Sequence, residues 1–360
     1  MPQSLQLIRD RFATLRRTQK ARHRDIADQL GLSEGELIAA HAGLDLDDTS
    51  STLRVMRLQA HWPALVTSLE TLGTVMALTR NASCVHETTG VYCNTTENGQ
   101  AGTVHGEGIH LQFFYRVWKH GFSVVEQTEQ GTQRSLQFFD ATGNAIHKVF
   151  MKPNSHVDAY EKLTAKFAAP DQAPGLMVQV HAKKHGQVTD ADVDTKAFHR
   201  AWDGLRRAND FGALLQSFGL SHAQALRLAD PLYTQKIEPE DCQTVLQSAA
   251  TQAVPITVQV GNAGALQQYC GPINRVAVMG PWVNVLDPTF NLHLREDLVA
   301  SAWVVKKPTV DGLVTSLELF DQHDEWIATI CGAQKNGMPE TCEWRDLIQQ
   351  TQQEPKTCPV

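Results

Sequence analysis

The sequence lacks the features of a membrane-embedded or secreted protein. No apolar run approaches the roughly 18 residues of a membrane span. The first 24 residues are rich in arginine and contain no apolar segment of the kind found in secretory signals. The seven cysteines are odd in number, widely spaced and without a CxxC pair, which fits neither a disulfide framework nor a structural zinc site. We therefore expect a cytoplasmic protein with reduced thiols and no membrane insertion.

Several common catalytic signatures are also missing. The chain has no GxGxxG, GxxxxGK[ST], HExxH or GxSxG motif, so nucleotide-binding and common hydrolase functions lose their strongest cue. Of the 360 residues, 42% are apolar and 20% are charged, which supplies a packed core and excludes extensive disorder. The 32 basic and 39 acidic side chains give a net charge of −7. This balance disfavours non-specific binding to nucleic acid.

The chain contains an internal repeat. When the sequence is shifted by 181 positions, Asn81 falls on Asn262, and the motif S-L-x-[FL]-F-D at 135–140 falls on 316–321. The segment Leu-Gly-Leu-Ser at 30–33 also matches Phe-Gly-Leu-Ser at 218–221, at a shift of 188. We predict a first repeat at 1–160, a connection at 161–195, a second repeat at 196–335, and a C-terminal helix and tail at 336–360.

Each half has the same predicted order of elements, helices followed by strands. Helices are expected at 24–40 and 62–72 in the first half, and at 196–216, 221–229 and 240–250 in the second. Strands are expected at 75–79, 136–139, 256–260 and 317–320. This order predicts an α+β fold made by tandem duplication of helices followed by an antiparallel meander sheet. A cleft between the halves would be the default ligand site.

The segment from Asp25 to Leu37 resembles a helix-turn-helix, with a glycine at the turn and Ser33 as the cap of its second helix. A DNA-binding regulator is therefore one alternative. Glu34 and Glu36 would lie where phosphates approach, so a structural hairpin is the favoured interpretation. We expect its apolar residues to be buried against the first-half sheet, namely Ile26, Leu30, Leu32 and Leu37.

Fifteen histidines are the one unusual count. Imidazole is a common ligand for iron, copper and zinc, and the candidates are His86, His199, His222 and His293. No pair has the close spacing of a zinc site, but an axial ligand to haem needs only one histidine together with cations for the propionates. Lys307 could supply such a cation, or could be a charged residue at a strand end. Each histidine alone also fits a surface or hydrogen-bonded role.

The block from Trp282 to Phe320 carries a resemblance to a known family. Together with the S-L-Q-F-F-D motif at 135–140 and C-V-H-E at 84–87, it resembles the bacterial haemin-uptake proteins of the HemS/HmuS type. These proteins are haemin-degrading factors or cytoplasmic haem carriers. The resemblance implies a duplicated α+β fold, haem as ligand or substrate, a role in iron utilisation, and a haem ABC transporter or a haem oxygenase as a partner. It leaves open whether the chain is a haem-degrading enzyme.

The resemblance also assigns site positions, and several of them have changed. The axial histidine of the family falls on Asn209, its distal arginine on Gln112 and a cleft arginine on His222. A propionate-side lysine is retained as Lys307, a second propionate-side cation falls near Gln334 with Lys335 beside it, and the histidine of the V-H-E motif is retained as His86. Asn is a poor iron ligand, and the Gln112 amide carries no positive charge.

Two interpretations follow from these replacements. In one, haem binds through another histidine, in the order of preference His222, His86, His293 and His199. His222 leads because it replaces a residue that lines the cleft of the family. In the other, the chain is a paralogue that has switched its ligand or has lost haem binding.

Overall fold

The computed structural model describes residues 4–19, 21–44, 53–180, 188–333 and 338–353. These residues form two compact units. Unit 1 comprises Met1–Arg80, Glu87–Ala182 and Asn262–Gln267, and unit 2 comprises Asn81–His86, Lys183–Gly261 and Gln268–Val360. Each unit therefore takes one short segment from the part of the sequence that otherwise builds the other. Gln334 and Lys335 lie outside the described residues.

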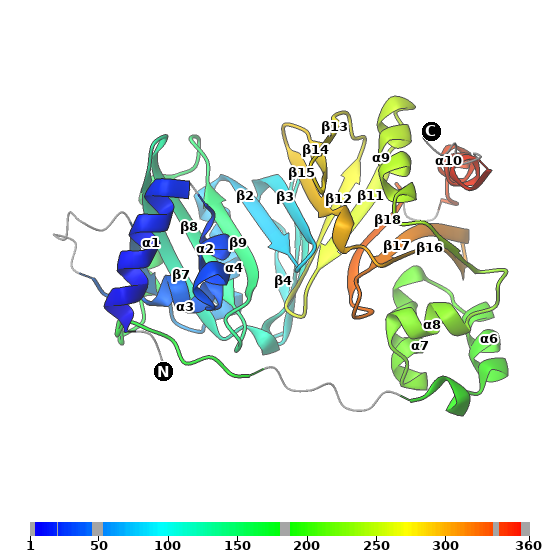
Figure 1. Ribbon diagram of the computed structural model, residues 1–360, viewed down its shortest axis with the longest axis horizontal. Coiled ribbons are helices and arrows are strands. Elements are labelled where there is room, and N and C mark those ends of the chain that lie inside the picture. The colour runs from blue at the N-terminus through cyan, green and yellow to red at the C-terminus, as the bar shows by residue number, and fades with distance from the viewer. Residues whose placement is uncertain (1–3, 20, 45–52, 181–187, 334–337, 354–360) are drawn as a thin grey trace. The chain divides into compact units, whose positions relative to one another are not determined.

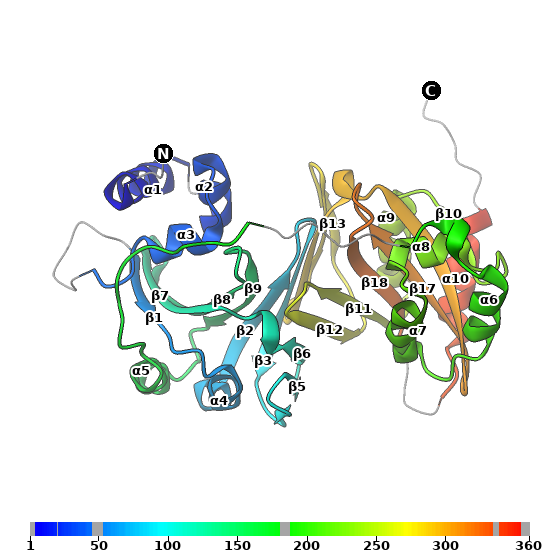
Figure 2. The same ribbon diagram turned by 90° about the horizontal axis from the view of Figure 1, so that it is seen from below.

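Unit 1 is a sheet with helices on both faces. Its strand order is β1 (Leu53–Arg57), β7 (His120–Thr128), β8 (Gly131–Phe139), β9 (Ala145–Met151), β2 (Thr74–Arg80) and β3 (Cys84–Val91). In Figure 2, α1 (Leu5–Gln19), α2 (His23–Leu30) and α3 (Glu34–Ala39) cover one face, and α4 (Trp62–Ser68) and α5 (Val157–Lys166) cover the other. The remaining elements are β4 (Thr96–Glu97), β5 (Ala101–His105), β6 (His110–Phe114), η1 (Leu69–Leu72) and η2 (Tyr115–Val117).

Unit 2 has the same arrangement. Its strand order is β10 (Thr234–Ile237), β16 (Ser301–Thr309), β17 (Gly312–Phe320), β18 (Trp326–Gly332), β11 (Ile256–Gly261) and β12 (Ala265–Gly271). Helices α6 (Thr195–Asp203), α7 (Phe211–Phe218) and α8 (His222–Leu228) cover one face, and α9 (Asp241–Thr251) and α10 (Cys342–Gln353) cover the other (Figure 1). The remaining elements are β13 (Val276–Met279), β14 (Trp282–Leu286), β15 (Phe290–Arg295), η3 (Asp190–Asp192), η4 (Ala208–Asp210) and η5 (Glu296–Leu298).

The predicted α+β fold and its tandem duplication are confirmed, and the repeat register reappears in the strands. Strands β7 and β8 begin at His120 and Gly131, and β16 and β17 begin 181 residues later at Ser301 and Gly312. A core lies on each face of both sheets. In unit 2, one core packs Val245 and Trp344 against Leu317, and the other packs Trp202 against Phe320.

Two asparagines at equivalent positions of the repeat make the same set of hydrogen bonds. The Asn81 side chain donates to the carbonyls of Gly261 and Ile327 and accepts from the backbone N–H groups of Ser83 and Cys84. Shifted by 181 residues, Asn262 makes the corresponding four hydrogen bonds, to the carbonyls of Arg80 and Ile146 and from the N–H groups of Gly264 and Ala265. Each asparagine ties together a tight turn and the end of a strand in its own unit.

The helix predicted over 196–216 is wrong in its middle. The chain forms α6, then the single turn η4, then α7. Helix α6 ends at its C-cap Gly204, and Arg207 has extended backbone angles that no helix continues through. Asn209 therefore lies on a separate exposed turn and not on the helix that carries His199.

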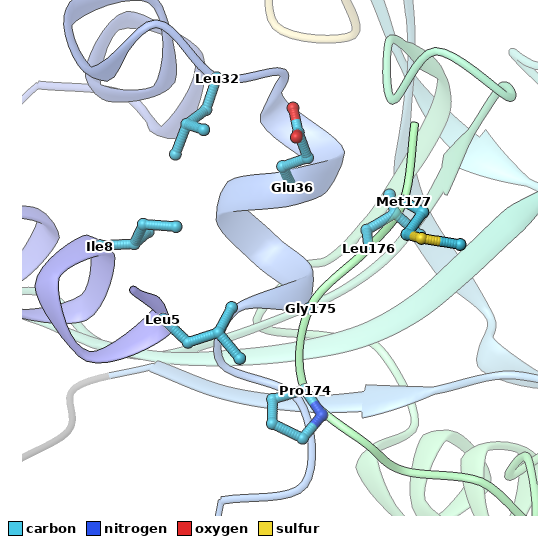
Figure 3. A pocket seen from close by; sticks show the side chains of 8 residues that line it. All are labelled: Leu5, Ile8, Leu32, Glu36, Pro174, Gly175, Leu176 and Met177. Carbon is cyan, nitrogen blue, oxygen red and sulfur yellow. The ribbon is translucent and has the colours of Figure 1, made fainter. Parts of the chain in front are cut away.

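The N-terminal hairpin is a structural element of unit 1. Ile26, Leu30 and Leu37 are buried as predicted, and Glu34 is buried as well, so Glu34 is not presented to a phosphate backbone. The prediction for Leu32 was wrong. Figure 3 shows Leu32 beside an open groove between α1, α3 and the extended segment 174–177, lined also by Ile8 and Leu176. Its place on the turn between two short helices leaves it half-exposed.

Candidate functional site

His222 is held at the start of α8. The Ser221 side chain caps this helix by accepting the N–H of Gln224, which fixes His222 as the first helical residue. The His222 Nε2 lies 2.5 Å from Oε2 of Glu318 on β17. The His222 side chain is 26% exposed, whereas that of Glu318 is fully buried. The imidazole therefore lies at the boundary between the buried sheet surface and solvent.

Glu318 is the centre of a buried polar network. Its Oε1 accepts from Lys307 Nζ at 2.5 Å and from Ser316 Oγ at 2.9 Å, while Oε2 bonds to His222. Burial alone would raise the pKa of Glu318, but the neighbouring Lys307 and His222 hold this pKa well below its usual range. The carboxylate is ionised at neutral pH and cannot donate a proton, so the His222 Nε2 carries the hydrogen.

Aromatic rings enclose the same network. The ring of Phe211 on α7 lies 5.1 Å from the imidazole of His222, centroid to centroid, and Phe320 lies at the same distance, both edge to face. The Lys307 Nζ lies 4.3 Å from the centroid of the Phe211 ring, a cation–π contact. The site thus combines an apolar wall with an ammonium group on one side of a carboxylate and an imidazole on the other.

Asn209 lies two residues before Phe211. It is the middle residue of η4, and its side chain is exposed. Val310 N–H donates to the carbonyl of Arg206, so the loop that leads into η4 is attached to the end of β16. Asn209 precedes α7, and the His222 ring contacts Phe211, the first residue of α7, so both belong to the helical face of unit 2.

His199 has a structural role. Its Nε2 lies 2.7 Å from the carbonyl oxygen of Leu228. A carbonyl only accepts, so this nitrogen carries the proton and bonds α6 to the end of α8. Trp202, three residues later, donates from Nε1 to the carbonyl of Lys306. These bonds hold α6 against α8 and β16.

His86 is enclosed in the core of unit 2. Its ring is fully buried beside Phe290, and neither ring nitrogen makes a hydrogen bond of good geometry within the described part of the chain. Burial lowers the pKa of His86 to about 3, despite a weak backbone contact from Val258. The ring is neutral at physiological pH and has no route to a ligand without opening the core.

His293 has a defined tautomer. Its Nδ1 lies 2.7 Å from Oδ1 of Asn284. The amide nitrogen of Asn284 donates to the carbonyls of Ala277 and Trp282, which fixes the orientation of the amide. Oδ1 is therefore an acceptor, and His293 Nδ1 donates the hydrogen. The side chain is half-buried on β15.

Gln112 is an exposed residue of β6 in unit 1, opposite Thr103. The structure brings His222 and Lys307 together within one network and places Asn209 on the same face, whereas His86 and His293 lie elsewhere in unit 2. The predicted cleft between the halves stays a prediction.

Glu318, the residue that joins His222 to Lys307, was not among the predicted site residues. A signal was available in the repeat, because Glu318 replaces Gln137 within the motif S-L-x-[FL]-F-D. Both positions are buried. A charged residue at a buried strand position needs partners, and this requirement points to cations nearby.

Unit 1 has a closed counterpart of this site. Glu34 follows the cap Ser33 as His222 follows Ser221, and Glu34 Oε1 lies 2.5 Å from Lys148 Nζ on β9. Both residues are nearly fully buried, at 7% and 6% exposure. Burial alone would raise the pKa of Glu34, but the charge of Lys148 lowers it. At this position unit 1 therefore has a buried ion pair, whereas unit 2 has a partly exposed imidazole.

No cluster of three or more His, Cys, Asp or Glu side chains suited to a metal ion occurs among the residues that the structure describes. Within the same ranges, no helix is both long and apolar enough to cross a bilayer.

Comparison with known proteins confirms the resemblance noted in the sequence. A family model described as the haemin-degrading HemS.ChuX domain matches residues 31–167 and 219–351. The hemin transport proteins HmuS of Yersinia pestis and HemS of Yersinia enterocolitica are 33% and 34% identical over 326 residues, which is 90% of this chain and 91% of each relative.

Solved structures agree with these matches over nearly the whole chain. The haem-bound form of PhuS, a haem-binding protein from Pseudomonas aeruginosa, is 39% identical, with a TM-score of 0.90, and the match covers 96% of this chain and 98% of that one. The haem-degrading enzyme ChuS from Escherichia coli O157:H7 is 30% identical, with a TM-score of 0.86, covering 96% and 99%.

Proposed function

This chain belongs to the haemin-degrading HemS.ChuX family, and from that membership and the geometry of unit 2 we propose that it is a cytoplasmic haem-binding protein of haemin uptake. The observation that carries the proposal is the partly exposed imidazole of His222, oriented by Glu318. Relatives named as haem-binding and haemin-transport proteins support haem as the cargo. The odd number and wide spacing of the cysteines fit a reducing compartment.

His222 is the first candidate for the iron ligand. A ligating histidine in proteins typically donates its other ring N–H to a carboxylate or carbonyl, which orients the ring and raises its basicity. His222 already makes this bond through Nε2 to Glu318, so Nδ1 is the nitrogen left for iron. Nδ1 is bonded to Cγ, the ring carbon that is attached to Cβ. An iron atom at Nδ1 would therefore lie close to the rest of the residue, and this crowding favours a weak axial bond. His293, half-buried on β15, is the competing candidate.

We further propose that the chain carries haem and does not degrade it. The family position for the axial histidine is Asn209, and the position for the distal arginine is Gln112. Both are amides that supply neither an imidazole to iron nor a positive charge to bound oxygen. Haem would then pass intact from a supplier such as an ABC transporter to an acceptor such as a haem oxygenase.

A haemin titration tests the binding proposal. We expect a red-shifted Soret band that saturates at micromolar haemin. An unperturbed free-haemin spectrum would contradict haem binding and would leave the paralogue without haem chemistry as the better account.

A second measurement tests the carrier proposal. The haemin complex is reduced with ascorbate in air, with catalase present to remove peroxide. The proposal predicts that the Soret band persists. A steady loss of this band with new absorption in the red would show that the chain degrades haem.

A further inference from the structure

Lys307 is buried, and its ammonium group contacts a carboxylate and an aromatic ring. Its Nζ lies 2.5 Å from Glu318 Oε1 and 4.3 Å from the centroid of the Phe211 ring. In the β16–β17 ladder, Lys307 is opposite Val314 and Val305 is opposite Ser316, so Lys307, Ser316 and Glu318 share one face of the sheet. Lys307 reaches diagonally over Ser316 to the carboxylate.

We infer that Lys307 is the counter-ion of Glu318, and that Glu318 is a positioning residue for the imidazole of His222, so that Lys307 acts on haem through this carboxylate and not by binding a propionate. This inference rests on the proposed function. It replaces the role that the resemblance gave to Lys307, and it assigns a role to Glu318, which the resemblance left without one.

The burial of Glu318 decides between the two roles of Lys307. If Lys307 turned to a propionate, it would leave a fully buried carboxylate with Ser316 and His222 as its remaining partners. Leaving a buried charge uncompensated costs more than one exposed charge-assisted contact returns. Lys307 therefore stays with Glu318 when a ligand approaches.

The duplicated unit shows that this network is specific to unit 2. At the positions of Glu318, Lys307 and His222, unit 1 carries Gln137, Glu126 and Glu34. The Gln137 amide donates to Ser135 Oγ, the counterpart of the bond between Ser316 and Glu318. Unit 1 thus keeps one neutral hydrogen bond of this network, while its Glu126 and Glu34 pair with other cations, Arg16 and Lys148. The arrangement of a lysine and a histidine on one buried carboxylate therefore occurs in unit 2 and not at the corresponding positions of unit 1.

The test compares haemin with haemin dimethyl ester, in which both propionate charges are removed. We expect Lys307→Met to weaken the binding of both porphyrins by the same factor, roughly tenfold. The matched control is Lys306→Met, since Lys306 is adjacent and exposed, and it should stay within about twofold of wild type. A loss seen with haemin and absent with the dimethyl ester would overturn the inference and make Lys307 a propionate ligand.

A second measurement tests the positioning role of Glu318. Glu318→Gln keeps the shape of the side chain and removes its charge, so the imidazole of His222 loses basicity. We expect the iron–imidazole stretching frequency of the ferrous complex to fall in this variant. An unchanged frequency together with unchanged haemin affinity would show that Glu318 does not act on the ligand.

Thermal unfolding of the haem-free protein separates this inference from the proposed function. Lys307→Met should lower the melting temperature because it leaves Glu318 buried without its main partner, and Glu318→Gln/Lys307→Met should recover most of that loss. Additive losses would contradict the ion pair. If wild type leaves the haemin spectrum unperturbed, the proposed function fails, and this cycle still reports on the pair.

Discussion

Glu34 and His222 occupy the same position in the two copies of the fold, and each makes a 2.5 Å contact with a side chain of its own sheet. Glu34 is sealed against Lys148, whereas a quarter of the His222 side chain reaches solvent. The duplication has therefore produced one closed and one open site.

This difference predicts the binding stoichiometry. We expect one haem per chain, because unit 1 offers no ligand at the position of His222. A haemin titration followed at the Soret band should break at one equivalent. A break at two equivalents, or a second coordination spectrum after the first is saturated, would contradict this account.

Asn209→His should be a gain-of-function change. Asn209 is exposed on η4, so an imidazole at this position is accommodated without entering the core. We expect the variant to bind haemin roughly tenfold more tightly than wild type, because an unhindered imidazole is a stronger ligand than the crowded Nδ1 of His222. The matched control is Asn209→Gln, which adds bulk without a ligand and should bind as wild type does. Equal affinity of Asn209→His and wild type would show that this turn does not face the haem.

His86 makes the stability of the protein depend on pH. Its pKa is about 3 in the folded state and about 6.5 when exposed. The unfolded state therefore binds the extra proton first, and the stability contributed by neutral His86 is complete above about pH 6.5 and is lost as the pH falls. Between pH 8 and pH 5 this loss amounts to about 2 kcal/mol.

His86→Leu removes this dependence. We expect urea unfolding to show that the variant loses about 2 kcal/mol less stability than wild type between pH 8 and pH 5. His323→Leu, at an exposed position, is the matched control and should lose as much as wild type. The same pH dependence in His86→Leu and wild type would mean that His86 is not buried as a neutral ring.

The two equivalent asparagines should be equally important. Asn81→Ala and Asn262→Ala each remove two donated and two accepted hydrogen bonds at a turn. We expect each to cost about 2–4 kcal/mol in the free energy of unfolding, measured by urea denaturation. Costs that differ severalfold would show that the two turns do not support their units in the same way.

The sequence predicted the fold well because its strongest signals are local or repeated. The register of 181 residues aligned β7 and β8 with β16 and β17, and apolar runs marked β2 and β11. The break between α6 and α7 was not predicted. A single glycine such as Gly204 is only a weak signal for the end of a helix, and no residue type in the sequence marks the extended backbone at Arg207.

The site was harder to predict because the role of each histidine depends on a distant partner. His199 and His222 looked alike as helical residues, but one bonds to a carbonyl 29 residues away and the other to a carboxylate 96 residues away. Lys307 was predicted as a propionate-side cation or as a charged residue at a strand end, because its partner, Glu318, lies on the neighbouring strand. Such pairings come from strand register and helix packing, which one sequence does not display.

The most direct test of the account is the absorption and electron paramagnetic resonance spectrum of the haemin complex in wild type beside two variants, His222→Gln and His293→Gln. Glutamine at position 222 can still donate to Glu318, so the fold is kept while the imidazole is removed. We predict a histidine-ligated, high-spin ferric spectrum in wild type that is lost in His222→Gln and unchanged in His293→Gln. An unchanged spectrum in His222→Gln would contradict the account, and its loss in His293→Gln would place the iron ligand on β15.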